Sequence, residues 1–246
     1  MGLFASLIFN HVKRRELVIR DRSFDQAKKG LKFKPFITVS RESGSGGKLI
    51  AKKVAKKLNF QYYNKKLIEM TSRKAKKRKA LIATLDEKER GFMDDLVHSL
   101  LNPDYVSEQT FIKSLFEVVL SIARKGHCVI IGRGGNFITS QYGGLNVRVV
   151  APFLVRAGFT AQYEKYSLYE ARERVKKFDK ERKEYIKQYF GKDPSNANYY
   201  DLVINTTYLS IDQAVDIVIM AFKRKFPEWR PGIHRVNKRR LRTRTS

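Results

Sequence analysis

The sequence predicts a three-layer α/β domain built around a parallel central sheet. Two observations predict it: short β-branched apolar runs recur along the chain, and segments with helical periodicity separate them. Strands that alternate with helices form parallel sheets, which carry helices on both faces. A hydrophobic fraction of 42% supplies enough apolar surface for such a core and excludes a wholly disordered chain. No apolar run reaches the ~18–20 residues needed to span a bilayer.

The first predicted strand, a glycine-rich loop and a helix follow one another directly. Residues 36–39 are apolar and β-branched, which is typical of a buried strand. Serines and glycines at 43–47 come next, and apolar residues spaced four apart then predict a helix: Ile50, Val54 and Leu58. A second helix is expected to end before Gly126, which suits the C′ position. Its apolar face consists of Phe111, Leu115, Val119 and Ile122.

Three more strands and a closing helix complete the predicted domain. The strands are expected at 127–131, 147–150 and 201–204. The last helix begins with Ser210 and Gln213 at the spacing of a capping box. Its apolar face consists of Val215, Val218, Ile219 and Phe222. The predicted domain therefore covers residues 36–222.

The chain carries a large positive charge, and much of it lies at the two ends. Its 51 Lys and Arg against 24 Asp and Glu give a net charge of +27. Residues 1–35 hold nine basic and three acidic side chains, and residues 223–246 hold ten basic and one acidic. We expect these segments to be basic arms. Six more basic residues at 73–79 form either a solvated helix face or a phosphate-contacting surface. Such a charge indicates polyanionic partners.

Cysteine and histidine usage narrows the chemistry, and the amino terminus leaves the compartment open. The single Cys128 excludes a disulfide framework, and four scattered histidines offer no metal-ligand spacing, so no metal ligands are predicted. Residues 1–6 fit an N-myristoylation pattern, and the acid-poor stretch also suits an organellar presequence or an uncleaved arm. We expect a cytoplasmic or organellar-matrix protein, with the mitochondrial matrix included, without a transmembrane segment or membrane-surface contact.

The loop between the first strand and its helix carries the main chemical signal. A glycine-rich turn at a helix N-terminus directs backbone N–H groups into a concavity, and phosphate is the usual occupant of such a site. Against the pattern G-x-x-x-x-G-K-[ST], Arg41 holds the first glycine position and Gly46 the second. Gly47 stands at the lysine position and Lys48 at the Ser/Thr position. The loop therefore predicts phosphate binding with a lysine displaced by one residue, although a simple chain-reversing turn is an alternative.

Five blocks of sequence together resemble the cytidylate kinase-like family. They are Ile37–Lys48 (ITVSRESGSGGK), Tyr62–Ile68 (YYNKKLI), Ile130–Asn136 (IIGRGGN), Asp179–Gly191 (DKERKEYIKQYFG) and Tyr200–Thr206 (YDLVINT). The resemblance spans about residues 36–222, with the blocks in family order. It implies the P-loop NTPase fold of nucleoside monophosphate kinases: a parallel core sheet, an acceptor-binding subdomain and a mobile lid. It also implies ATP and Mg²⁺ as cofactors and a nucleotide as partner.

The resemblance assigns roles to particular residues. Arg41 and the loop would hold the donor phosphates, through Ser43, Gly44, Ser45, Gly46, Gly47 and Lys48. The catalytic candidates are Lys48, Arg133 and Arg182, with Arg133 on the acceptor phosphate and Arg182 closing over the transferring phosphate. Such cations fit the chemistry, because phosphoryl transfer needs positioning and charge neutralisation. Asp179 and Arg182 also have the i, i+3 spacing of a surface ion pair.

Several departures from the family pattern argue that activity is reduced or lost. Gly134 replaces an aspartate associated with the cytosine base, and Asn64 stands where relatives usually carry aspartate. Ser40 rather than an acid ends the first strand, so no protein anchor for Mg²⁺ is evident. Gly158 also interrupts a segment that is a regular helix in relatives.

Two functional hypotheses from different classes therefore remain. The first is a nucleotide-binding, kinase-like enzyme that transfers a phosphoryl group from ATP to CMP or a related nucleoside monophosphate. The second is a non-catalytic component of a ribosome or another ribonucleoprotein particle, in which the basic arms contact RNA. The arms contain few aromatic residues, so phosphate contacts rather than base stacking are expected in that case.

Overall fold

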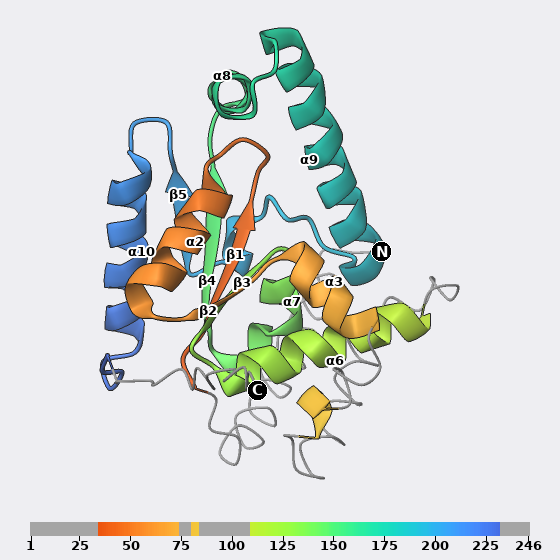
Figure 1. Ribbon diagram of the computed structural model, residues 1–246, viewed down its shortest axis with the longest axis vertical. Coiled ribbons are helices and arrows are strands. Elements are labelled where there is room, and N and C mark those ends of the chain that lie inside the picture. Colours follow the sequence, from red (N-terminus) through yellow and green to blue (C-terminus); the bar gives the residue numbers. More distant parts are fainter. Residues whose placement is uncertain (1–33, 74–79, 84–108, 232–246) are drawn as a thin grey trace, which may run out of the picture.

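The computed structural model describes residues 34–73, 80–83 and 109–231. A five-stranded sheet of order β2-β3-β1-β4-β5 runs through the molecule, with all neighbouring strands parallel. Helices cover both faces of the sheet (Figure 1). The predicted three-layer α/β fold class is confirmed. Most of the two basic arms, residues 74–79 of the basic cluster and residues 1–6 lie outside the described residues.

Each strand is followed by at least one helix. The strands are β1 (Ile37–Arg41), β2 (Gln61–Tyr63), β3 (Cys128–Ile131), β4 (Leu145–Val150) and β5 (Leu202–Asn205). The α-helices are α2 (Gly47–Leu58), α3 (Lys65–Arg73), α6 (Gln109–Lys125), α7 (Gly135–Ile138), α8 (Phe153–Glu164), α9 (Leu168–Phe190) and α10 (Ile211–Lys225). Two short 3₁₀ helices lie at Ser140–Tyr142 and Ala197–Tyr199.

Alternation along the strands divides the core into two apolar layers. Ile37 and Val39 of β1 pack with buried residues of α2 and α10 on one face of the sheet. The other face packs against α6 and α7, with Ile130 of β3 and Phe116 of α6 among its buried members. Thr38, between Ile37 and Val39, points to this second face and donates a 2.6 Å hydrogen bond to Asn146 of β4. Successive side chains of β1 point to opposite faces of the sheet. Both faces therefore carry buried residues, and helices must cover both.

Most predicted elements are present, with shifted ends. The four predicted strands start one residue later, or two residues earlier for β4, and β1 continues to Arg41. The short edge strand β2 was not predicted, because its exposed and half-buried residues give no apolar run. The expected break at Gly158 is wrong: α8 is continuous from Phe153 to Glu164. No heavy atom lies within 4 Å of a Cβ built on Gly158, so this glycine meets open space.

Helix caps fix the ends of the long helices. The capping box of Ser210 and Gln213 at the start of α10 is confirmed, and Gly126 ends α6 with a left-handed φ of 64°. A second capping box, which the sequence analysis missed, joins Ser167 and Glu170 at the start of α9. Because this box sits at the turn after α8, it determines where the hairpin of α8 and α9 reverses.

Aromatic packing closes the domain at the amino-terminal ends of the strands. The ring of Trp229 contacts those of Phe60 and Phe222, with centroid distances of 5.9 and 5.3 Å. Phe60 also contacts His127 edge-on at 5.5 Å, and the backbone N–H of His127 donates to the carbonyl oxygen of Pro35. Packing therefore continues past residue 222 as far as Trp229. The chain enters and leaves the described domain beside the same ring, Phe60.

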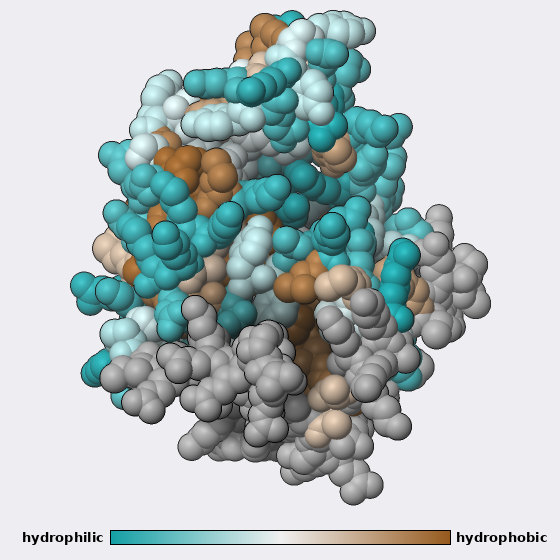
Figure 2. All heavy atoms as spheres, viewed as in Figure 1, coloured by the Kyte–Doolittle hydropathy of each residue, from teal (hydrophilic) through white to brown (hydrophobic). Residues whose placement is uncertain are grey.

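Helix α9 lies at the surface of the domain, and little of its length is buried. Hydrophilic side chains cover most of the visible face of α9 (Figure 2). This helix is 23 residues long, but only Ala171, Val175, Ile186 and Phe190 are buried. Among the described residues, no helix combines the length and apolar character needed to cross a membrane.

We expect Trp229→Ala to lower the free energy of unfolding by about 2 kcal/mol, roughly half the loss at a fully buried tryptophan, because Trp229 is half-buried. Chemical denaturation of the full chain measures it. Met220→Ala is the control, since Met220 is 58% exposed on α10 and should change stability by less than about 0.5 kcal/mol. Equal stability of the two variants would mean that the packed domain ends before Trp229.

Candidate functional site: a glycine loop under a cationic lid

The glycine-rich loop joins the end of β1 to the first turn of α2. Ser45 is 1% exposed, and its hydroxyl lies 2.9 Å from the carbonyl oxygen of Glu42 and 3.2 Å from that of Val149. Thr206 donates a 3.1 Å hydrogen bond to the carbonyl oxygen of Ser45. The loop is thus held from β4 and from the end of β5. No acidic residue lies in the first turn of α2, so the positive end of that helix dipole faces the loop without compensation.

Two positions in the loop require glycine. Gly44 and Gly46 have φ angles of 77° and 76°, in the left-handed region that strains other residues. A Cβ on Gly44 would also overlap the backbone carbonyl oxygen of Arg156, which belongs to α8. The loop therefore packs directly against the lid hairpin of α8 and α9. This close approach explains the glycine independently of any ligand.

A cavity of about 820 Å³ opens above the loop. Of the residues assigned to phosphate binding, all except Ser45 line it: Arg41, Ser43, Gly44, Gly46, Gly47 and Lys48. Arg182 also lines this cavity, whereas Arg133 lines an adjoining cavity of about 480 Å³. Arg41 and Arg182 border both cavities. The structure thus brings together residues more than 130 positions apart in the chain.

Cations gather around the two cavities. Burial, followed by repulsion from Arg182, lowers the pKa of Arg41 to about 10, so its guanidinium stays charged at neutral pH. Burial also lowers the pKa of Arg182, although the nearby Asp179 opposes this. The charge of Arg133, more than burial, lowers the pKa of Lys65. All three shifts disfavour the charged forms, so an anion in the cavities would relieve the repulsion.

Arg156 fastens the lid to the loop. This arginine is 8% exposed and donates to the carbonyl oxygens of Ala151, at 2.7 Å, and Ser43, at 3.0 Å. It also pairs closely with Asp179 of α9 and at 3.3 Å with Glu42. Asp179 in turn accepts a 2.7 Å hydrogen bond from the backbone N–H of Ser43. The chain therefore forms a continuous polar bridge from α9 through Arg156 to the loop.

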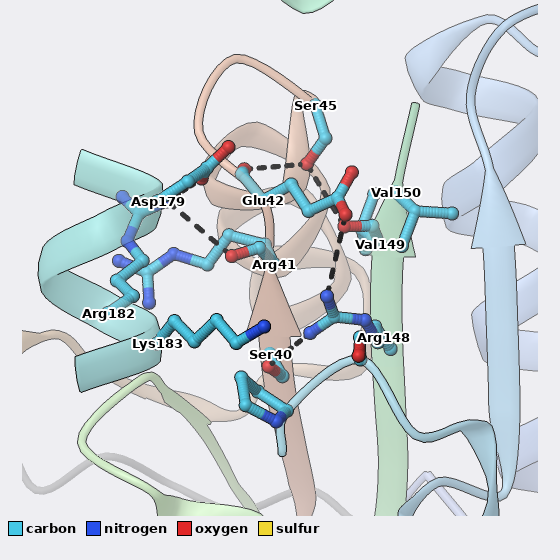
Figure 3. A network of polar contacts seen from close by, with 12 residues as sticks. Ser40, Arg41, Glu42, Ser45, Arg148, Val149, Val150, Asp179, Arg182 and Lys183 are labelled. Atoms are coloured by element: carbon cyan, nitrogen blue, oxygen red, sulfur yellow. Dashed lines mark hydrogen bonds and ion pairs between the residues drawn. The ribbon is translucent and has the colours of Figure 1, made fainter. Parts of the chain in front are cut away.

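The expected ion pair of Asp179 and Arg182 is present but is not the main contact of either residue. Arg182 Nη1 lies 3.7 Å from Asp179 Oδ1 and 3.5 Å from the carbonyl oxygen of Arg41. Figure 3 shows both side chains projecting from α9 toward Arg41. The short contacts of Asp179 are to Arg156 and Ser43, which leaves the Arg182 guanidinium directed at the shared wall of the cavities.

Arg133 sits in an unusual turn after β3. Its φ is 56°, and the flanking Gly132 and Gly134 are also left-handed, at 79° and 65°. The guanidinium pairs with Glu69 of α3 and lies 4.9 Å from the ring centre of Tyr185 of α9. Its Nε is buried without a hydrogen-bond partner. A strained backbone that presents a partly unsatisfied arginine to a cavity is typical of a functional position.

Two departures from the family pattern have structural explanations. A Cβ on Gly134 would overlap the ring of Phe190, so the aspartate of relatives does not fit this turn unless that ring moves. Asn64 caps α3 by accepting a 2.9 Å hydrogen bond from the N–H of Leu67, and its side chain still borders the larger cavity. Asparagine preserves the cap that an aspartate would make but removes a negative charge from the cavity wall.

Three further residues at the site, Arg148, Arg156 and Lys65, were not predicted from the sequence. Arg148 is 7% exposed on β4 and borders the smaller cavity. Its position between Val147 and Val149 in a buried strand was a usable signal, because an arginine at such a position needs a partner. Arg156 lies in an apolar helix segment and offered a similar signal. Among the described residues, no group of three or more histidine, cysteine or acidic side chains could hold a metal ion.

Comparison with known proteins gives a consistent picture. Residues 36–208 match the sequence model of the cytidylate kinase-like family. The chain is 26% identical over 189 residues to a cytidylate kinase of Sulfolobus acidocaldarius, an alignment that covers 77% of this chain and 94% of that protein. A cytidylate kinase of Ignicoccus hospitalis is 24% identical over 189 residues, covering 74% and 95%.

One solved structure resembles the fold closely. It is an uncharacterized protein from Eubacterium ventriosum, with a TM-score of 0.64 and 23% sequence identity. The match covers 78% of this chain and 99% of that one. At this identity the similarity concerns the fold.

A pair of glycine substitutions tests the contact between loop and lid. We expect Gly44→Ala to lower the free energy of unfolding by about 2 kcal/mol or more, because a Cβ there meets Arg156 and the φ is left-handed. Gly158→Ala should raise it by about 0.5–1 kcal/mol, because it removes a glycine from the interior of a helix. Urea denaturation distinguishes them, and destabilisation by Gly158→Ala would contradict the open surroundings of that site.

Proposed function

The chain belongs to the cytidylate kinase-like family, and from this membership we propose that it transfers a phosphoryl group from ATP to CMP or a related nucleoside monophosphate. The observation that carries the proposal is the larger cavity, where the glycine loop, the N-terminus of α2 and five cations border one space. The cations are Arg41, Lys48, Lys65, Lys66 and Arg182. A triphosphate is the ligand whose charge and shape such an arrangement fits.

The donor phosphates would lie on the loop. Backbone N–H groups at the start of α2 would donate hydrogen bonds to the phosphate oxygens, and the helix dipole favours negative charge there. Lys48 is exposed, borders the cavity and forms no ion pair with any described residue, so its ammonium group is available to a phosphate. This would let Lys48 act from a position one residue later than usual.

The transferring phosphoryl group would lie between the two cavities. There Arg41 and Arg182 border both spaces, and their repulsion would be relieved by the charge of the transferring group. Arg133 would hold the acceptor phosphate from the turn after β3. An oxygen of the acceptor phosphate would then attack the terminal phosphorus of the donor, and ADP would leave with the bridging oxygen.

Magnesium supplies charge neutralisation when it accompanies the nucleotide, but the described residues offer no dedicated site for it. Glu42 accepts from the N–H of Ala151 at 3.2 Å and pairs with Arg156, and Asp179 is bound to Arg156 and Ser43. Both carboxylates near the loop are therefore occupied by protein donors. We propose that Mg²⁺ would be held by the phosphates and water rather than by side chains.

We expect Lys48→Ala and Arg133→Ala each to reduce phosphoryl transfer from ATP to CMP about tenfold or more, because each removes a cation from the transferring or acceptor phosphate. Lys52→Ala is the matched control, one turn further along α2, exposed and outside both cavities. A coupled assay of ADP release measures the rates. Binding of ATP by the wild-type protein without turnover would contradict the proposed phosphoryl transfer and would leave nucleotide binding as the function of the domain.

A second candidate function is RNA binding, and one observation favours it. Pro35 and Trp229, which belong to the two basic segments 1–35 and 223–246, both lie beside the aromatic pair of Phe60 and His127. The arms therefore leave the domain from neighbouring points, at the end of the sheet opposite the glycine loop. We propose that residues 1–35 and 223–246 act together as one polycationic extension of the kinase-like domain.

For this candidate we expect single-stranded RNA to bind the full chain with an affinity that falls steeply between 50 and 200 mM salt, on the order of 10³-fold for six or more phosphate contacts. Replacing Lys238, Arg239 and Arg240 by alanine in the full chain should weaken binding and flatten the salt dependence. Fluorescence anisotropy measures both. If this variant binds RNA as tightly as the wild type, these three residues of the carboxyl-terminal arm do not contribute to RNA binding.

A further inference from the structure

The smaller cavity contains an arginine that the transfer step does not use. Arg148 stands opposite Ser40 in the register of β4 and β1, and its side chain borders the cavity. The residue is only 7% exposed. A guanidinium removed from water needs short hydrogen bonds to offset the loss of hydration.

The polar contacts of Arg148 are all long, and its guanidinium also lies over the ring of Tyr200, 5.5 Å from the ring centre. Nη1 lies 3.4 Å from the hydroxyl of Ser40 and 3.5 Å from that of Tyr200, and Nη2 lies 3.5 Å from Glu42 Oε1. Charge-assisted hydrogen bonds are usually about 2.7–2.9 Å long. The one carboxylate among these partners is also shared, because Glu42 contacts Arg156 and the N–H of Ala151 at shorter distances.

A second cation and a hydroxyl face the same place. Figure 3 shows Lys183 reaching from α9 toward Ser40 and Arg148. Within the described residues, the one ion pair of Lys183 is a 3.9 Å contact with Asp193, and the Lys183 side chain is 64% exposed. Tyr200 donates its hydroxyl proton to the carbonyl oxygen of Pro194 at 2.8 Å, so it can only accept from Arg148. The Ser40 hydroxyl lies 3.3 Å from that of Tyr200, and its own proton can be donated to a ligand.

The balance of charge around the cavity favours an anion. Six cationic side chains border it: Arg41, Lys65, Arg133, Arg148, Arg182 and Lys183. Four acidic side chains border it as well: Glu42, Asp179, Glu181 and Asp193. Of these, Glu42 and Asp179 are engaged by Arg156, and Asp193 accepts from the N–H of Ser195 at 3.0 Å. The nearest carboxylate oxygens of Arg148 and Lys183 are therefore Glu42 Oε1 at 3.5 Å and Asp193 Oδ2 at 3.9 Å, both longer than a charge-assisted hydrogen bond.

We propose that Arg148, Ser40 and Lys183 form an oxyanion subsite, which binds a phosphate or carboxylate group at the end of the smaller cavity away from Arg133. The molecule that fills this cavity then carries an anionic group at that end, in addition to the phosphate that Arg133 holds. This second statement names the acceptor class and rests on the proposed function; the oxyanion subsite itself does not. A cytosine base could accept hydrogen bonds from Arg148 through O2 or N3, but it would supply no negative charge to the cations of this cavity.

Arginine side-chain NMR tests the subsite directly. The Nε–Hε signal of Arg148 is identified by its loss in Arg148→Met, and the ¹⁵N-labelled full chain is then titrated with inorganic phosphate and, separately, with acetate. We expect the Arg148 signal to shift saturably with phosphate, with acetate or with both; which anion acts distinguishes a phosphate from a carboxylate ligand. An Arg148 signal that moves with neither anion overturns the proposal.

Two lysine variants on α9 supply the comparison. Lys183→Met should weaken the dissociation constant read from the Arg148 signal by about threefold to tenfold, the loss of one charged contact. Lys187→Met, four residues further along and outside both cavities, should leave it within about twofold. If both variants weaken anion binding equally, the effect comes from the overall surface charge and not from a contact at the subsite, and the proposal is overturned.

ATP binding to the wild-type chain is measured in the same series. Arg148 does not border the larger cavity, so Arg148→Met should retain the ATP affinity of the wild type. A wild-type chain that shifts its Arg148 signal with phosphate but does not bind ATP would refute the proposed kinase function while leaving the subsite intact.

Discussion

The guanidinium of Arg156 is the contact on which the arrangement of the site depends. It joins the end of β4 through Ala151, the glycine loop through Ser43 and the lid helix α9 through Asp179. Because the guanidinium is buried, its charge must be matched by well-placed acceptors, and Asp179 and Glu42 supply them. Gly44 then has to be glycine, since the backbone of Arg156 occupies the space beside it. One side chain thus couples the position of the hairpin of α8 and α9 to the shape of the glycine-rich loop.

The remaining arginines at the site show the opposite situation. Arg41, Arg133 and Arg182 converge on two connected cavities, and both burial and mutual repulsion lower the pKa of Arg41. Such crowding costs folding free energy and is typical of a site arranged for a ligand rather than for stability. The protein therefore uses arginine in two ways within one small region: Arg156 is fully matched and structural, whereas its neighbours are left short of negative charge.

The fold could be predicted from the sequence because its signals are local. Apolar β-branched runs gave the four long strands, and the serine and glutamine at 210 and 213 gave the start of α10. The site could be predicted only where a motif marks it, as at Ser43–Lys48 and Arg133. Arg148 and Arg156 were not predicted as site residues. Their partners Ser40 and Ser43 lie more than 100 residues away in the sequence, and no spacing rule connects residues so far apart. The same separation hid the second role of Asp179, whose expected partner three residues later, Arg182, is not its closest partner.

Helix α9 is anchored unequally at its two ends. Its last turns carry Ile186 and Phe190, which belong to the core, whereas the buried residues of its first turns, Ala171 and Val175, belong to neither core cluster. A helix of 23 residues is about 34 Å long, so a tilt of about 5° at Phe190 would move Leu168 by about 3 Å. Such a tilt would also have to carry Asp179, midway along the helix, together with its contacts to Ser43 and Arg156. Small adjustments around Phe190, far from any phosphate, would change the width of the cavity mouth.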